Sequence, residues 1–121
     1  MMLRVLVIED DEIIGRAMVR HLLAAGADPT LVSTGEEGLA QFRSDPPDVC
    51  VLDLTLPGID GWRLIETVRS SGISTPIIIV SARAFEQARA RVLGIGSENY
   101  LVKPFPMREL VKRVDAAAES R

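Results

Sequence analysis

The feature that most constrains the fold is a set of apolar runs, each followed by a segment with helical spacing. Three runs, at 3–8, 48–53 and 76–81, are apolar at successive positions rather than at alternate ones. A strand that is apolar on both faces is typical of a parallel sheet covered by helices on either side, because a sheet with one wet face alternates apolar and polar residues. Shorter strands are predicted at 30–32 and 99–102.

A helical segment follows each predicted strand. Asp11 and Thr34 are predicted N-caps of the first two helices, because short polar side chains accept hydrogen bonds from the first free amides. Two further helices are predicted at about 60–71 and 85–94, and the fifth begins at Pro106. The expected inner stripe of the first helix is Ile14, Met18, His21 or Leu22, and Ala25.

Composition limits the class of protein. A chain of 121 residues, 47% hydrophobic and 26% charged, indicates one α/β domain over 1–121. The net charge of −3 argues against direct nucleic-acid binding, which needs a basic face. The single cysteine, Cys50, lies in an apolar run, so we expect a buried thiol and a cytoplasmic protein. Acidic residues at 9–12 argue against a signal peptide, and no apolar run is long enough for a membrane span.

Polar side chains stand where the predicted strands end. In a parallel sheet these ends lie at one edge, so we expect the side chains to converge there. The residues are Glu9 and Asp10 after the first strand, Asp53 at the end of the third, Ser81 at the end of the fourth and Lys103 after the fifth.

Three carboxylates against one ammonium favour a bound cation, because clustered carboxylates repel one another. Mg²⁺ suits such a set of oxygen ligands. An ionised Asp53 could then attack an electrophilic phosphorus, with Lys103 and the metal stabilising the phosphoryl oxygens. The alternatives are structural: acidic residues at 10–12 suit a helix N-terminus, and Asp53 could cap the next helix or the loop that contains the Pro57–Gly58 turn. Ser81 could be a solvated strand-end serine.

The motifs at these strand ends are similar to those of the receiver domain of bacterial response regulators. The similarity covers essentially the whole chain, is closest in style to the receivers of OmpR- and PhoB-type transcriptional regulators, and implies the CheY-like strand order 2-1-3-4-5. The motifs are Leu6-Val7-Ile8-Glu9-Asp10-Asp11, Leu52-Asp53-Leu54-Thr55-Leu56-Pro57-Gly58-Ile59-Asp60-Gly61, Ile79-Val80-Ser81-Ala82 and Tyr100-Leu101-Val102-Lys103-Pro104-Phe105.

The resemblance implies a role for each site residue. Asp53 would accept a phosphoryl group from a sensor histidine kinase or a phosphotransfer protein. Asp10, Asp53 and the backbone carbonyl of Thr55 would bind Mg²⁺ directly, and Glu9 would act through water. Lys103 would pair with the phosphate, and its bond to the following proline is typically cis.

The resemblance also implies a switch. After phosphorylation the hydroxyl of Ser81 would move toward the phosphoryl group and the ring of Tyr100 would swing inward, which would bias the surface formed by the fourth helix, the fifth strand and the fifth helix. Regulators of this kind can dimerise through that surface. Ion pairs across a two-fold axis are expected from Arg89, Glu98, Glu109 and Arg113, and the alternative is an ordinary solvated charged face.

Three other functions compete with a phosphorylated switch. An aspartyl phosphatase of the haloacid-dehalogenase type would need a second aspartate at the position of Thr55. A flavodoxin-like FMN carrier would need a phosphate-binding loop where acidic residues stand. A receiver-like scaffold that is never phosphorylated would not need the full set of polar residues. The sequence therefore predicts a non-enzymatic phosphoacceptor rather than an enzyme.

Overall fold

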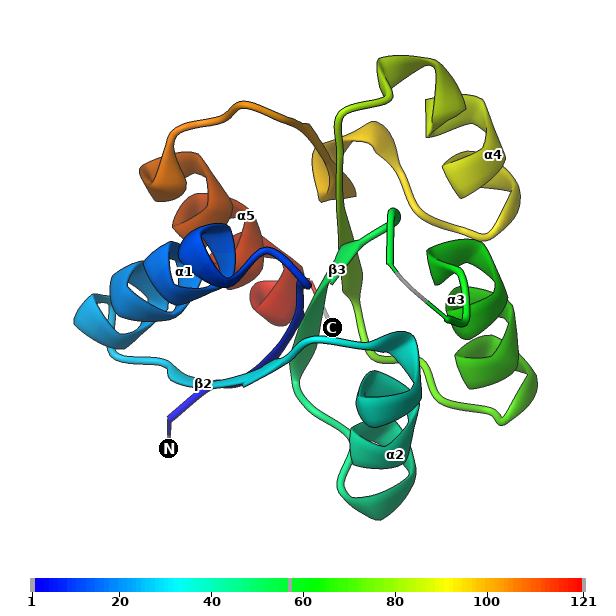
Figure 1. The fold of residues 1–121 in the computed structure, drawn as a ribbon, viewed down its shortest axis with the longest axis horizontal. Helices are drawn as coiled ribbons and strands as arrows, with labels where there is room; N and C mark the ends of the chain where they lie inside the picture. The colour runs from blue at the N-terminus through cyan, green and yellow to red at the C-terminus, as the bar shows by residue number, and fades with distance from the viewer. Residues whose placement is uncertain (1, 57, 121) are drawn as a thin grey trace.

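The computed structural model describes residues 2–56 and 58–120, with the backbone alone at residue 85 (Figure 1). Among these residues, five parallel strands form one sheet in the order β2-β1-β3-β4-β5, which confirms the predicted fold. Pro57, part of the predicted turn after the third strand, lies outside the described residues. No helix in the described part of the chain is long and apolar enough to cross a bilayer.

The helices and strands alternate along the chain as predicted. The strands are β1 (Arg4–Ile8), β2 (Asp28–Val32), β3 (Val49–Asp53), β4 (Ile77–Ser81) and β5 (Tyr100–Val102). The helices are α1 (Glu12–Ala24), α2 (Gly35–Ser44), α3 (Gly61–Ser70), α4 (Gln87–Val92) and α5 (Met107–Glu119), with short 3-10 turns at Ala84–Glu86 and Ser97–Asn99.

Two apolar layers cover the sheet, one on each face. Val5 and Val7 of β1 pack toward α1 and α5, whereas Leu6 and Ile8 face the layer of α2, α3 and α4 (Figure 1). All four side chains are almost fully buried. Burial on both faces explains why the central strands are apolar at every position. Cys50 of β3 is fully buried, as predicted, and burial raises the pKa of its thiol.

Side-chain caps begin the first three helices. The Asp11 carboxylate accepts hydrogen bonds from the amides of Ile13 and Ile14 at 3.0 and 3.1 Å. Thr34 caps α2 by accepting from the Glu37 amide at 3.1 Å, as predicted, and Asp60 caps α3 in the same way. These caps supply partners for amides that no helical carbonyl can reach.

The structure differs from the sequence-based expectations in three places. Strand β2 begins at Asp28 and includes Pro29, which an edge strand tolerates because one side of it has no pairing neighbour. The predicted fourth helix is divided into a 3-10 turn and a six-residue helix that ends before Gly94. Ala25, expected on the inner stripe of α1, is the exposed C-cap residue instead.

The Asp11 cap can be tested by substitution. Asp11→Ala should lower the free energy of unfolding by about 1 kcal/mol, because two amides lose their acceptor. Asp11→Asn should lose less, since its side-chain carbonyl still accepts. Urea denaturation followed by circular dichroism measures both, and an unchanged midpoint for Asp11→Ala would contradict the capping role.

Candidate functional site

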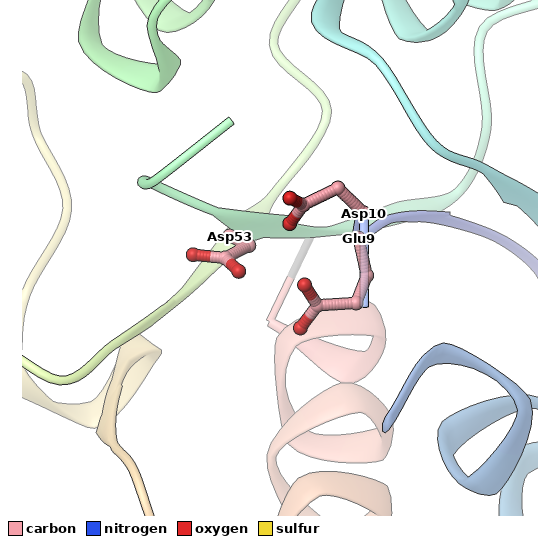
Figure 2. A group of neighbouring side chains, drawn as sticks. All are labelled: Glu9, Asp10 and Asp53. Atoms are coloured by element: carbon pink, nitrogen blue, oxygen red, sulfur yellow. The ribbon is translucent and has the colours of Figure 1, made fainter. Parts of the chain in front are cut away.

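Three carboxylates meet at the carboxyl ends of β1 and β3. Pairing of Ile8 with Leu52 aligns the two strands so that Glu9 and Asp10 leave β1 beside Asp53, the last residue of β3. One carboxylate oxygen from each residue lies within 4.8 Å of the other two (Figure 2). The expectation that residues distant in sequence converge at one edge is therefore correct for this cluster.

Lys103 bridges two of these carboxylates. Its Nζ donates to Glu9 Oε1 and to Asp53 Oδ2, each at 3.0 Å. Glu9 and Asp53 are 2% and 5% exposed, so both charges would be costly without this partner. The Lys103 amide donates to the Ser81 carbonyl at 2.8 Å, which places the lysine at the end of β4. The Lys103–Pro104 bond is cis, as the resemblance implies.

Burial and neighbouring charges shift the pKa values of Glu9 and Lys103. Burial, and then the hydrogen bond with Asp53, raise the pKa of Glu9 from 4.5 to about 7, against the opposing effect of Lys103. Burial would lower the pKa of Lys103, but the hydrogen bonds with Asp53 and Glu9 outweigh it, so that pKa is raised. The lysine therefore stays charged, and its ammonium group is shared between the carboxylates of Glu9 and Asp53.

Asp53 also organises the loop that follows it. Its Oδ1 accepts a hydrogen bond from the Thr55 amide at 2.9 Å, so one carboxylate oxygen contacts the loop and the other contacts Lys103. Asp53 therefore does cap the loop, as the structural alternative predicts. Loop capping alone does not explain why Glu9, Asp10 and Lys103 also surround the Asp53 carboxylate. The side chain of Thr55 is exposed.

The chemistry of the donor set fits a hard divalent cation. All three side chains offer carboxylate oxygens, and neither a thiolate nor an imidazole takes part. Such oxygen-only sites suit Mg²⁺, which keeps several waters when one or two carboxylates bind it. Asp10 is exposed and Asp53 is buried, so a cation bound between them would be reached from solvent.

Ser81 and Tyr100 both contact the backbone of Arg83. Ser81, 1% exposed, accepts a hydrogen bond from the Arg83 amide at 3.0 Å. The Tyr100 hydroxyl donates to the Arg83 carbonyl, and the residue is 3% exposed. The ring therefore occupies the inward position, and the solvated alternative for Ser81 is wrong because the residue is buried.

The four charged residues expected on a dimer surface lie in two places. Arg113 contacts Glu109 at 2.9 Å and donates to the backbone carbonyls of Ser97 and Glu98, so three of the four positions adjoin one another. Arg89 instead lies over the ring of Trp62 in α3, with its guanidinium carbon 4.7 Å from the ring centre. That cation–π contact joins α4 to α3, and no local sequence pattern indicates it.

Comparisons with known proteins show that the chain is similar to bacterial response regulators. The response regulator receiver domain family matches residues 5–115. The chain is 40% identical over 111 residues to the transcriptional regulatory protein BaeR of Escherichia coli, covering 92% of this chain and 46% of BaeR. It is 36% identical over 116 residues to the response regulator MprA of Mycobacterium bovis, covering 96% of this chain and 50% of MprA.

The fold has close counterparts among solved structures. The receiver domain of the Francisella response regulator 1452 superimposes with a TM-score of 0.89 and 32% identity, covering 98% of each chain. The chain spans about half the length of the curated relatives that it matches. The similarity to transcriptional regulators confirms the resemblance found in the sequence.

The raised pKa of Glu9 predicts a pH dependence. Between about 4.5 and 7 the folded protein holds a proton that the unfolded chain releases, so this group makes the metal-free fold less stable as pH rises through that window. Thermal unfolding in EDTA across the window should show a downward slope with pH that is smaller in Glu9→Gln. Glu12→Gln, at an exposed position, is the control, and equal slopes in all three proteins would contradict the shift.

The contact between Arg89 and Trp62 predicts a second result. Arg89→Ala should lower the free energy of unfolding by about 0.5–1 kcal/mol and change the emission of Trp62, because the cation leaves the ring face. Arg91→Ala removes an equal charge from an exposed position of the same helix and should change neither. Denaturation followed by tryptophan fluorescence measures both properties, and identical spectra for wild type and Arg89→Ala would rule the contact out.

Proposed function

The chain belongs to the response regulator receiver domain family, and from this premise we propose that it is a phosphorylation-dependent switch of a two-component signalling system. In this proposal Asp53 is the phosphoacceptor and the chain is a substrate of phosphoryl transfer rather than an enzyme. The observation that carries the proposal is the placement of Asp53 at the end of β3, within hydrogen-bond distance of Lys103 and among the carboxylates of Glu9 and Asp10.

The proposed transfer is a substitution at phosphorus. A carboxylate oxygen of Asp53 forms a bond to phosphorus as the phosphorus–nitrogen bond of a phosphohistidine breaks, and the electron pair of that bond returns to the imidazole. The Thr55 amide and the Lys103 ammonium hold the carboxylate in one orientation. Positioning and charge stabilisation supply most of the rate in such reactions, so a pre-formed site suits this chemistry.

Lys103 has a second role in the proposal. Its ammonium already lies 3.0 Å from an Asp53 oxygen, so it can pair with a phosphoryl oxygen once one is attached there. Asp10, Asp53 and the backbone carbonyl of Thr55 would hold Mg²⁺, with Glu9 acting through water. The metal, when bound, supplies positive charge that offsets the carboxylates and the phosphoryl oxygens.

Ser81 and Tyr100 would connect the phosphoryl group to the surface of α4, β5 and α5. Ser81 accepts a hydrogen bond from the Arg83 amide, and its own proton stays available to donate to a phosphoryl oxygen. Tyr100 binds the carbonyl of the same residue, so a shift of Ser81 would reach the tyrosine through Arg83. The proposal is supported by the shared backbone partner, because both buried side chains bond to Arg83.

The partners follow from the same proposal. A sensor histidine kinase or a phosphotransfer protein would supply the phosphoryl group in the cytoplasm. A homodimer formed on activation would use the surface of α4, β5 and α5, with Glu98, Glu109 and Arg113 at its charged part and Arg89 joining it only by leaving Trp62. The net charge of −3 supports a domain that does not itself contact nucleic acid.

Phosphorylation of Asp53 can be tested directly. Phosphoramidate with Mg²⁺ should add one acid-labile phosphoryl group to the wild type, and intact-mass measurement detects it. Asp53→Asn should remain unlabelled, because its amide is a poor nucleophile, whereas Asp115→Asn at an exposed position of α5 should label normally. EDTA should abolish labelling. A phosphoryl group that persists in Asp53→Asn would refute the assignment, and an unlabelled wild type would favour the scaffold function.

A further inference from the structure

Among the described residues of the loop between β3 and α3, one backbone amide donates a hydrogen bond to a side chain of α2. The other contacts of the loop are to neighbouring segments of the chain or to the core: the Thr55 amide donates to Asp53 at the end of β3, Asp60 caps α3, and Leu54 is buried in the core. The Ile59 amide, however, donates a hydrogen bond to Glu36 Oε2 at 3.2 Å, across 23 positions of sequence. Glu36 stands in the first turn of α2, so this bond ties the loop to a different helix.

Two glycines allow the loop and α2 to approach so closely. Gly58 has φ of +79°, and a Cβ there would lie 2.6 and 2.7 Å from the two carboxylate oxygens of Glu36. A Cβ on Gly35 would lie 2.2 Å from a methyl carbon of Ile59 and 2.9 Å from its carbonyl oxygen. A side chain on Gly35 would press against the backbone of Ile59. A side chain on Gly58 would displace the Glu36 carboxylate and would also be strained by the positive φ.

Helix α2, which carries Glu36, is held in place by an N-cap and by a buried side chain. Thr34 caps its first turn, and Phe42, which is fully buried, packs in the same cluster as Ile8 of β1. Ile8 directly precedes Glu9 and Asp10. The hydrogen bond from Ile59 to Glu36 therefore connects the loop that carries Thr55 to the layer packed against the strand that carries the other two carboxylates.

We propose that Glu36 is a positioning residue for the phosphoacceptor site. By holding the Ile59 amide, it anchors the end of the loop that adjoins α3. The start of the same loop carries the backbone of Thr55 beside Asp53. Glu36 touches neither of the reacting groups, so its effect reaches the site through the loop. This inference rests on the proposed function, because it assigns Glu36 a part in the same Mg²⁺-dependent transfer.

Two substitutions separate positioning from charge. Glu36→Ala removes both the acceptor and the charge, whereas Glu36→Gln removes the charge and keeps a side-chain carbonyl that can accept from Ile59. Glu66→Ala, at an exposed position of α3, is the control for loss of one negative charge. The Gln variant also controls for any effect of the carboxylate on the helix dipole of α2.

The experiment has three measurements on the whole chain. Glu36→Ala should speed amide hydrogen exchange at Ile59 roughly fivefold, which is the loss expected for one hydrogen bond, and weaken Mg²⁺ binding in calorimetry by a similar factor. Phosphorylation by phosphoramidate should slow by the same factor at limiting Mg²⁺ and recover at saturating Mg²⁺. Glu36→Gln should behave nearly as wild type in all three, and so should Glu66→Ala.

The outcomes distinguish this inference from the proposed function. Wild-type exchange at Ile59, or wild-type Mg²⁺ affinity, in Glu36→Ala would overturn the positioning role while labelling of Asp53 stands. Equal losses of Mg²⁺ affinity in Glu36→Gln and Glu36→Ala would show that the charge of Glu36, not its hydrogen bond, affects the site. That result would also overturn the positioning role. A wild type that neither binds Mg²⁺ nor accepts a phosphoryl group would overturn the proposed function and the positioning role together.

Discussion

The contact of the Lys103 ammonium with both Glu9 and Asp53 is the interaction on which the rest of the site depends. Two buried carboxylates this close would repel each other strongly, and a single cation 3.0 Å from each makes the arrangement tolerable. The lysine comes from the end of β5 and the carboxylates from β1 and β3. Only a parallel sheet brings these three strand ends to one edge, so the fold and the site have the same cause.

The strands that carry most of the site are deeply buried, whereas helix α4 is short and buries little. Most site residues stand at the ends of the central strands β1, β3 and β4, whose apolar side chains are buried on both faces, whereas Lys103 follows the edge strand β5. Helix α4, by contrast, is six residues long, buries Ala90 and contacts α3 through Arg89 and Trp62. In the proposed switch, the site would stay in place while the surface of α4 moves, because a signal requires one element with two accessible arrangements.

Sequence reasoning succeeded where a local pattern decides the structure. The Asp11 and Thr34 caps follow from hydrogen bonds within four residues, and the buried strands follow from uninterrupted apolar runs. It was less accurate where the tertiary environment overrides the pattern. The predicted strand at 30–32 extends back to Asp28, because the edge position of β2 accommodates Pro29, and Ala25 falls past the end of α1 although the helical stripe included it.

The sequence by itself determined the order of strands and helices along the chain and the strand ends that carry charged side chains, because these depend on periodicity. It also indicated the family to which the chain belongs, because short motifs carry that information. Only the tertiary structure decided that one lysine serves two carboxylates, that Arg89 covers Trp62 and that Glu36 holds the loop through Ile59. These contacts depend on how the helices pack and where side chains of different elements meet. No local pattern in the chain specifies that packing.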